Sequence, residues 1–366
     1  MTDEKKQLLR TMAKHYGTDA VVIYNPQWHK ENYRFLTGEN FIAPMAVTIY
    51  TVCEDTFSVF YSSVWDKEYN ETRISNISAI SLISPDMSQP VQWLKKHNVK
   101  SIALSGEKYI PAILKNTFIT GGIEIISGDG FLEKARLRKT KKEIEYLEHA
   151  VHLSENAWEV FMESVSDGLN EYQIAANVEY YLKSNGAEDN FLLMSTGGKE
   201  IRGMTPPMMR TAKPGDMVRT EITPQYKGYW AQVCRTCVKG KANDDQLKAF
   251  SIYLESEQAG FDAIRPGVNI SDVAKAENDV FRKYGYGEYC TEKYTRGRGH
   301  GHGLDLDEQP LISESTDLIL EENMVIVVHP NTYNPLCGYM VFGDPVEITK
   351  DGYRILSTAE RKLFEV

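Results

Sequence analysis

A short run late in the chain concentrates residues that can do chemistry. From Arg298 to Pro310, the sequence RGHGHGLDLDEQP holds two histidines, three glycines and three acids. Glycine lets a backbone pass close to a ligand, and the imidazole of histidine titrates near neutral pH. The run therefore predicts a reaction centre to which His300 or His302 brings an imidazole.

A third histidine stands at the end of an apolar run. His329 follows residues 324–328 and precedes Pro330. Burying a polar group without a partner costs free energy, so a polar residue that ends a buried strand usually faces a pocket. We therefore expect His329 to point into a pocket.

The five cysteines do not predict a reactive or metal-binding site. Their odd number and wide spacing are typical of reduced thiols in a cytosolic protein. Cys234 and Cys237 form a CxxC, but they alternate with Val233 and Val238 as in a buried strand. We therefore assign this pair no redox or zinc role.

Length, composition and charge bound the class of protein. The chain has 366 residues, of which 42% are hydrophobic and 25% charged, and this suits a globular protein of two domains or one large domain. A net charge of -10 argues against nucleic acid or an acidic membrane surface as partner. The N-terminus lacks a signal-peptide core, and no stretch approaches the roughly 20 apolar residues of a membrane span. We expect a cytoplasmic protein.

The elements that must position these residues fall into two parts. The first part alternates strands and helices, with strands predicted at residues 20–24, 45–50, 56–60 and 101–105. A basic run at residues 133–142 then marks a domain boundary. Thr140 and Glu143 form a capping-box pattern, which predicts the start of a helix. Further on we expect helices at residues 171–185 and 245–264, a hairpin of residues 217–222 and 229–238 around Lys227-Gly228, and strands at residues 324–330 and 341–349.

This order of elements resembles the creatinase / aminopeptidase P / methionine aminopeptidase family. The similar tracts are NYRFLTG at residues 32–38, RKTKKEI at 138–144, the hairpin from Gly228, the Gly299-His300-Gly301 run, and the two late strands. The resemblance implies an α+β fold. A pita-bread catalytic domain at residues 136–366 would follow a creatinase/prolidase-like α/β N-terminal domain at residues 1–135. It also implies a homodimer.

The resemblance extends only in part to the metal site. Metallopeptidases of this family use two Asp, one His and two Glu to hold two divalent ions, and the matching positions here are Glu221, Gln232, His300, His329 and Gly343. A dinuclear site needs several anionic oxygens to offset its charge, and one carboxylate cannot supply them. We therefore expect a divergent member that lacks the dinuclear site and binds no cofactor.

Two further positions depart from the family. A second family histidine falls on Asp307, and a histidine upstream of the hairpin falls on Met204. Creatinase is metal-free and cleaves a carbon–nitrogen bond with that upstream histidine as its acid/base. Creatine hydrolysis therefore does not carry over directly to this chain.

The first hypothesis for function is a metal-independent, creatinase-like hydrolase or lyase. It would cleave a C–N bond of a small polar amide or amidine. His300 or His329 would act as acid/base, Glu221 would orient a histidine, activate water or attack, and Asp307 would join the catalytic set. The expected substrate-binding residues are Gln232, Arg235 and His302. A structural reading also stays open, in which Arg235 holds the hairpin through an ion pair and His302 bonds a neighbour.

Two other hypotheses remain. Glu221, His300 and His329 would form a mononuclear site for one Zn or Fe ion if they converge. Alternatively, the pita-bread domain would be a non-catalytic binding module. The sequence does not identify the substrate.

Overall fold

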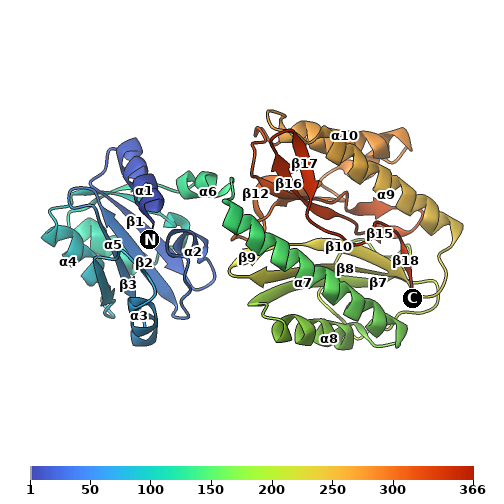
Figure 1. Cartoon of the computed structure of the whole chain (residues 1–366), viewed down its shortest axis with the longest axis horizontal. Coiled ribbons are helices and arrows are strands. Elements are labelled where there is room, and N and C mark those ends of the chain that lie inside the picture. Colours follow the sequence, from blue (N-terminus) through green and yellow to red (C-terminus); the bar gives the residue numbers. More distant parts are fainter. Residues whose placement is uncertain (1) are drawn as a thin grey trace. The chain divides into compact units, whose positions relative to one another are not determined.

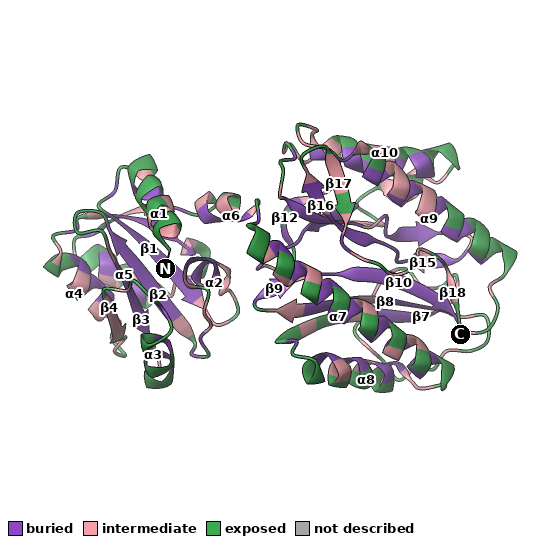
Figure 2. Cartoon of the chain, viewed as in Figure 1, coloured by how far each residue is buried: buried purple, intermediate pink, exposed green. Residues whose placement is uncertain are grey.

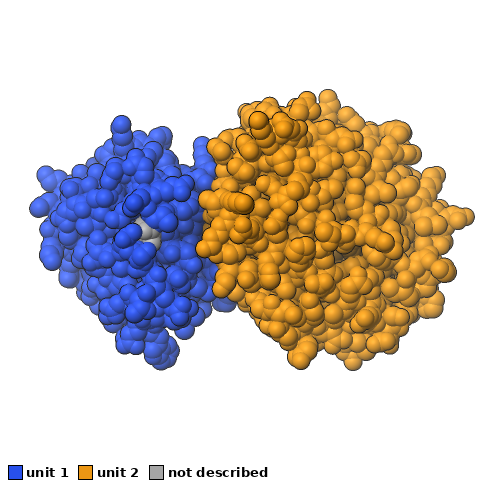
Figure 3. Space-filling view, in the orientation of Figure 1, with its two compact units in different colours: residues 1–136 blue, residues 137–366 orange. Residues whose placement is uncertain are grey.

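The structure, a computed structural model, describes residues 2–366. It divides into two compact units between Arg136 and Leu137 (Figure 3). The boundary expected from the basic run, after residue 135, lies one residue earlier. No helix in the described part is long and apolar enough to cross a membrane.

The N-terminal unit is built on a six-stranded sheet with the order β4-β3-β2-β1-β5-β6 (Figure 1). The pairs β1–β2 and β2–β3 are antiparallel, whereas the outer pairs are parallel. The strands are β1 (Ala20–Pro26), β2 (Met45–Thr51), β3 (Thr56–Tyr61), β4 (Ala79–Leu82), β5 (Ser101–Ser105) and β6 (Glu124–Ser127). The helices are α1 (Asp3–Tyr16), α2 (Glu31–Thr37), α3 (Val64–Glu71), α4 (Gln89–Lys96), α5 (Ala112–Thr120) and α6 (Phe131–Arg136), with a 3₁₀ turn η1 (Glu107–Tyr109).

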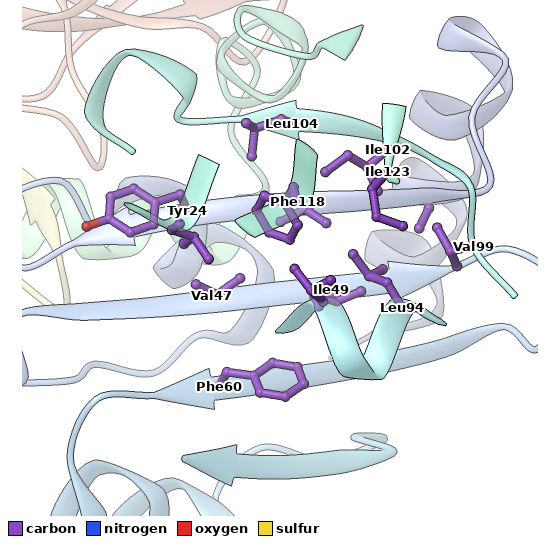
Figure 4. Packing of buried hydrophobic residues seen from close by; sticks show 14 residues of the cluster. Tyr24, Val47, Ile49, Phe60, Leu94, Val99, Ile102, Leu104, Phe118 and Ile123 are labelled. Atoms are coloured by element: carbon purple, nitrogen blue, oxygen red, sulfur yellow. The ribbon is translucent and has the colours of Figure 1, made fainter. Parts of the chain in front are cut away.

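One core cluster of this unit lies between the sheet and helices α4 and α5. Ile49 and Leu104 project from two of the central strands, and Leu94 and Phe118 project from the helices toward them (Figure 4). All four side chains are fully buried. The four strands predicted for this part of the chain are confirmed, because their apolar runs fill this core.

The C-terminal unit contains two five-stranded sheets, ordered β18-β10-β8-β7 with β9 paired to β8, and β12-β11-β13-β16-β17. A small pair, β14–β15, accompanies them. The helices are α7 (Lys141–Ser166), α8 (Glu171–Ser184), α9 (Asp244–Ala263) and α10 (Ile270–Lys283), with a 3₁₀ turn η2 (Gly287–Cys290). The strands are β7 (Asp189–Gly197), β8 (Met217–Tyr226), β9 (Tyr229–Trp230), β10 (Val233–Val238), β11 (Gly299–Gly301), β12 (Glu308–Leu311), β13 (Val325–Val328), β14 (Thr332–Asn334), β15 (Gly338–Met340), β16 (Asp344–Thr349), β17 (Gly352–Ile355) and β18 (Phe364–Glu365).

Each sheet of this unit is covered by one helix pair. Trp158 of α7 and Val178 of α8 pack against Ile222 of β8. Phe261 of α9 packs in a second cluster with Ile326 of β13. Figure 2 shows most of the strands buried and the outer faces of these helices exposed. The predicted α+β class is confirmed.

Local signals in the sequence set several element ends. Thr140 and Glu143 form the predicted capping box at the start of α7. Lys227 and Gly228 both have positive φ, 51° and 86°, as a tight two-residue hairpin turn requires. The strand expected at residues 341–349 begins only at Asp344, because Gly343 leaves that ladder to bridge with Cys234 of β10.

Candidate functional site

A cavity of about 330 Å³ opens in the C-terminal unit where β8, β11 and the end of β13 meet. Four residues of the predicted catalytic set line it, as does Gln232. The complete lining is Phe191, Leu193, Glu221, Thr223, Gln232, Thr295, Arg296, Gly297, Gly299, His300, Leu306, Asp307, Leu311, His329, Asn331 and Tyr339. The sequence therefore predicted part of the cavity lining but not the rest of it.

Glycines bring β11 close to its neighbours and so place His300. Gly299 has φ of 134°, and a Cβ there would lie 1.9 Å from the carbonyl oxygen of Val327 on β13. A Cβ on Gly301 would lie 2.2 Å from the carbonyl oxygen of Gln309. Only residues without a side chain fit at these two points, so the glycines of the run fix the strand on both sides of the histidine.

His300 is surrounded by oxygen acceptors. Its Nε2 lies 3.0 Å from Oε1 of Gln232 and 3.2 Å from Oδ1 of Asp307, and its Nδ1 lies 3.0 Å from the carbonyl oxygen of Gly301. The side chain is almost fully buried. Burial lowers the pKa of His300, and the nearby charge of Asp307 opposes that shift. The ring is thus fixed in orientation, with Nε2 directed at the cavity lining.

Glu221 faces the cavity from β8. Its Oε1 accepts a hydrogen bond of 2.9 Å from Nδ2 of Asn331. Burial raises the pKa of Glu221 to about 7, and the negative charge of Asp307 adds to this shift. A carboxyl group with a pKa near 7 can exchange a proton at neutral pH.

Asn331 is a lining residue that the sequence reasoning missed. Besides holding Glu221, it accepts at Oδ1 a 3.0 Å hydrogen bond from the backbone N–H of Phe342. Its side chain is buried. The sequence could have predicted Asn331, because this polar residue lies just after His329 at the end of the same apolar strand.

His329 lines the cavity but remains neutral at ordinary pH. Burial lowers the pKa of His329 to about 3, and the neighbouring His300 contributes. The two rings lie 5.5 Å apart, centroid to centroid. Nδ1 of His329 is buried and has no hydrogen-bond partner within residues 2–366. Such an imidazole is a weak base, so this environment does not favour His329 as the acid/base group.

Asp307 links His300 to a second missed residue, Arg296. Oδ2 of Asp307 lies 2.7 Å from Nη2 of Arg296, while Oδ1 faces His300. Both members of this ion pair are substantially exposed at the cavity mouth. Arg296 lies in a loop between η2 and β11, and no regular pattern in the sequence indicated that it would face the cavity.

Arg235 and His302 lie behind the cavity and do not line it, which does not agree with their predicted substrate-binding role. Nη2 of Arg235 pairs with Oδ1 of Asp344 at 2.6 Å, and both residues are buried. His302 accepts a 3.3 Å hydrogen bond at Nε2 from the backbone N–H of Gln232. These contacts agree with the structural reading of both residues, although Nε of Arg235 and Nδ1 of His302 are buried without a hydrogen-bond partner in the described part of the chain.

The side chains at the matching metal positions do not fit a pair of ions. Oε1 of Gln232 faces His300, and Gly343 offers no side-chain donor. A Cβ on Gly343 would lie 2.3 Å from Cβ of His329, so the position has no room for a larger residue. Glu221 is then the single carboxylate of the five, too few for a dinuclear centre. Within residues 2–366, no group of three His, Cys, Asp or Glu is found that could hold a metal ion.

Known proteins resemble this chain over most of its length. The model of metallopeptidase family M24 matches residues 145–355, which is more than half of the chain. The Xaa-Pro dipeptidase of Pyrococcus furiosus is 31% identical over 237 residues, covering 64% of this chain and 67% of that protein. A similar protein of the same name in Pyrococcus horikoshii is 30% identical and covers 64% and 66%. The matched segment thus spans about two thirds of these relatives.

Solved structures extend the likeness to the fold of the whole chain. The Xaa-Pro dipeptidase from Bacillus anthracis superposes with a TM-score of 0.88 at 21% identity, covering 99% of each chain. The prolidase from Pyrococcus horikoshii OT3 gives a TM-score of 0.87 at 24% identity, covering 99% of this chain and 100% of that one. The predicted combination of a pita-bread domain with a prolidase-like N-terminal domain is confirmed.

The same relatives correct two expectations. The predicted metal-independent hydrolase of amides or amidines is wrong, since the related proteins are named as peptide-cleaving Xaa-Pro dipeptidases. The expectation of no cofactor is contradicted as well, because the matching family is one of metallopeptidases. The creatinase-like label was drawn from lost ligand positions, and substitutions there do not identify a substrate. By the extent of the family match and the order of its elements, the chain belongs to metallopeptidase family M24.

Proposed function

We propose that this protein is a hydrolase of the Xaa-Pro peptidase kind that cleaves the peptide bond of a short peptide. The observation that carries the proposal is that two polar side chains, those of Glu221 and His300, line the same cavity and are each held by a neighbouring residue. Glu221 is held by Asn331, and His300 is held by Asp307. The names of the related dipeptidases support the choice of a peptide substrate.

The size and walls of the cavity support a small substrate. Its volume of about 330 Å³ lies at the small end of ligand sites, which favours a dipeptide over a protein chain. Phe191, Leu193, Leu306 and Leu311 give it an apolar side. An apolar wall opposite polar groups suits a compact ring such as that of proline, with the peptide bond turned toward Glu221 and His300.

Glu221 has the properties of a general base and acid. With a pKa of about 7, it is partly ionised at neutral pH and can take a proton from an attacking water. The water oxygen then forms a bond to the carbonyl carbon. Glu221, now protonated, returns the proton to the leaving nitrogen as the carbon–nitrogen bond breaks. The products are an amine and a carboxylic acid, which releases the second proton of the water to solvent at neutral pH.

His300 is placed to stabilise the oxygen of the reacting carbonyl. In the tautomer with the proton on Nε2, the ring directs an N–H toward the oxygens of Gln232 and Asp307. A substrate oxygen that replaces the Gln232 amide would take the same donor, and the donor would strengthen its hold as charge develops on that oxygen. Because His300 is held from both sides, little reorganisation is needed when the substrate enters.

Dipeptide hydrolysis tests the proposal. Purified protein is incubated with Ala-Pro, Gly-Pro and Ala-Ala, once with EDTA and once with added Mn²⁺, because the family is one of metallopeptidases. We expect proline release that falls by a factor of about 10² to 10⁴ in Glu221→Gln and His300→Ala. Lys199→Ala, which breaks an exposed ion pair with Asp245, serves as the control and should retain full activity. Folded protein that cleaves none of the dipeptides under either condition would refute the proposal.

We also propose that the protein is a homodimer, as the resemblance to prolidases implied. Sedimentation equilibrium would show a mass of twice 41.6 kDa if this is correct. A mass of one chain at micromolar concentration would exclude a stable dimer.

A further inference from the structure

A second hollow, of about 320 Å³, lies beside the cavity in the C-terminal unit. Its walls come from α10, from η2 and the loop after it, and from residues 312–315, while the segment 295–297 borders both the hollow and the cavity. The lining includes three arginines, two glutamates and four serine or threonine hydroxyls. Guanidinium and hydroxyl groups together suit a small oxyanion better than an apolar ligand.

Arg298 supplies a buried cation to this hollow and is only 1% exposed. Its Nε donates a 2.6 Å hydrogen bond to Oδ1 of Asn278. Its Nη1 donates to the backbone carbonyl oxygens of Pro330 and Asn331, at 3.1 and 3.3 Å. These bonds hold the guanidinium in one orientation, and Nη2 is the branch that they do not use.

Nη2 of Arg298 is buried and has no hydrogen-bond partner within residues 2–366. The guanidinium lies close to the thiol of Cys290, which also lines the hollow. Burial raises the pKa of Cys290, and Arg298 opposes that shift. A thiol is a weak acceptor, and a buried donor without a strong acceptor costs free energy. An oxyanion in the hollow would supply the missing acceptor.

Arg282 adds a second, more accessible guanidinium. Its side chain is 43% exposed, and it pairs with Asp279 at 2.7 Å and with Glu314 at 2.5 Å. A guanidinium has five N–H donors, so these two contacts leave donors for a ligand. The third arginine of the lining, Arg296, is already paired with Asp307 at the cavity.

The two glutamates of the lining, Glu292 and Glu314, decide which oxyanion fits. A carboxylate repels a bare anion but accepts a hydrogen bond from an O–H. Inorganic phosphate keeps at least one O–H at neutral pH, whereas sulfate keeps none. A phosphate monoester has mostly lost its last O–H at this pH, because its second pKa is about 6. Guanidinium groups next to carboxylates therefore favour inorganic phosphate over the other two.

We propose that this hollow is a binding site for inorganic phosphate, held by Nη2 of Arg298 and the guanidinium of Arg282, with a glutamate of the lining accepting its O–H. The bare phosphate oxygens face the two cations, and such charge-assisted hydrogen bonds are shorter and stronger than neutral ones. The site does not depend on the proposed peptidase activity, so either can fail without the other.

Calorimetric titration of the full chain at neutral pH with phosphate, sulfate and glycerol 3-phosphate tests the proposal. We expect a Kd of about 1 mM or tighter for phosphate, and binding at least about 10-fold weaker for the other two anions. Arg282→Gln should weaken phosphate binding by about 10-fold. Arg354→Gln is the matched control and should bind normally, because Arg354 is similarly exposed and also paired with two acids but does not line the hollow.

A carboxylate placed in the hollow provides a second variant that preserves the fold. Ser313 lines the hollow, and its Oγ accepts a 3.1 Å hydrogen bond from the backbone N–H of Ser315. In Ser313→Asp the carboxylate can accept the same bond, so the turn is kept, but its negative charge should abolish phosphate binding.

Alkylation of Cys290 locates the bound anion. Saturating phosphate should slow the reaction of Cys290 with iodoacetamide by at least about threefold, while the exposed Cys53 reacts at an unchanged rate. Peptide mass spectrometry measures both. The proposal is overturned by the absence of saturable heat up to about 10 mM phosphate, or by sulfate or glycerol 3-phosphate binding as tightly as phosphate. Unchanged phosphate affinity in Arg282→Gln or Ser313→Asp, or an unprotected Cys290, would overturn it as well.

Discussion

The polar residues behind the cavity and those in its lining are organised in different ways. Behind the cavity, Arg235 and Asp344 form a fully buried ion pair, and Arg361 extends it to Glu257. In the lining, Glu221 and His300 share one open space. The buried groups bond to one another and to backbone, as a structural role requires, whereas the lining groups border the cavity.

This difference distinguishes the buried residues that stabilise the fold from the lining residues that are available for chemistry. The Arg235–Asp344 pair joins β10 to the start of β16, which are 109 residues apart. It also binds the carbonyl oxygen of Gly343, the residue at which the expected late strand was interrupted. This buried network, which we call the scaffold, holds the strands that carry the lining residues in place. Changes in the scaffold should therefore act on stability, and changes in the lining should act mainly on activity and pH dependence.

The largest expected effect follows from breaking the scaffold. Arg235→Met leaves the carboxylate of Asp344 buried without its closest cation, and this should lower the free energy of unfolding by about 3 to 5 kcal/mol. Urea unfolding followed by circular dichroism measures the loss. Lys199→Ala, at an exposed ion pair, should change the same quantity by less than about 1 kcal/mol. A similar small change for both variants would show that the two regions do not differ as described.

The next effect concerns the pH dependence of stability. The pKa of Glu221 is about 7 in the folded protein, above its ordinary value of 4.5. A raised pKa means that the folded state holds the proton more tightly. The stability gained is therefore complete below about pH 4.5 and is lost as the pH rises through about 7. Relative to Glu221→Gln, which does not titrate, wild type should lose up to about 3 kcal/mol over this window.

Urea unfolding of both proteins at pH 4.5, 6, 7 and 8 measures that difference. Other buried acids titrate equally in the two proteins and cancel. A stability difference that stays constant from pH 4.5 to 8 would mean that the Glu221 carboxyl ionises at an ordinary pKa, and it would remove the basis for its acid/base role.

A smaller effect is expected for Asn331→Ala. The backbone N–H of Phe342 loses its acceptor, which should cost about 1 to 2 kcal/mol of unfolding free energy. The carboxylate of Glu221 also loses its 2.9 Å donor. Because that donor favours the charged form, the pKa of Glu221 should rise further. The midpoint of the pH–rate profile should then move to higher pH, and a midpoint that stays in place or moves lower would argue against this pairing.

The sequence predicted the secondary-structure elements that depend on local signals. Apolar runs located the central strands β1, β2, β3 and β5 of the N-terminal sheet, and Thr140 with Glu143 located the start of α7. The Lys227-Gly228 turn closed the hairpin that carries Glu221. Each of these depends on residues close together in the chain, so spacing and residue type were sufficient.

The missing parts of the site depend on contacts between distant segments. Asn331 reaches Glu221 across 110 positions of the chain. The pairing of Arg235 with Asp344 makes it a scaffold residue, and no local pattern distinguishes that from substrate binding. The low pKa of His329 follows from burial and from the neighbouring His300. Residue types alone suggested an acid/base histidine, whereas its surroundings keep it neutral.

Isotope incorporation shows directly whether this protein hydrolyses a peptide bond by attack of water. Ala-Pro is incubated with the protein in H₂¹⁸O, and the products are analysed by mass spectrometry. Hydrolysis by water attack predicts proline without the label and alanine that carries one ¹⁸O in its new carboxylate, with both products lost in Glu221→Gln. Absence of cleavage by folded wild type, or cleavage that yields unlabelled alanine, would show that the protein does not hydrolyse this peptide bond by attack of water.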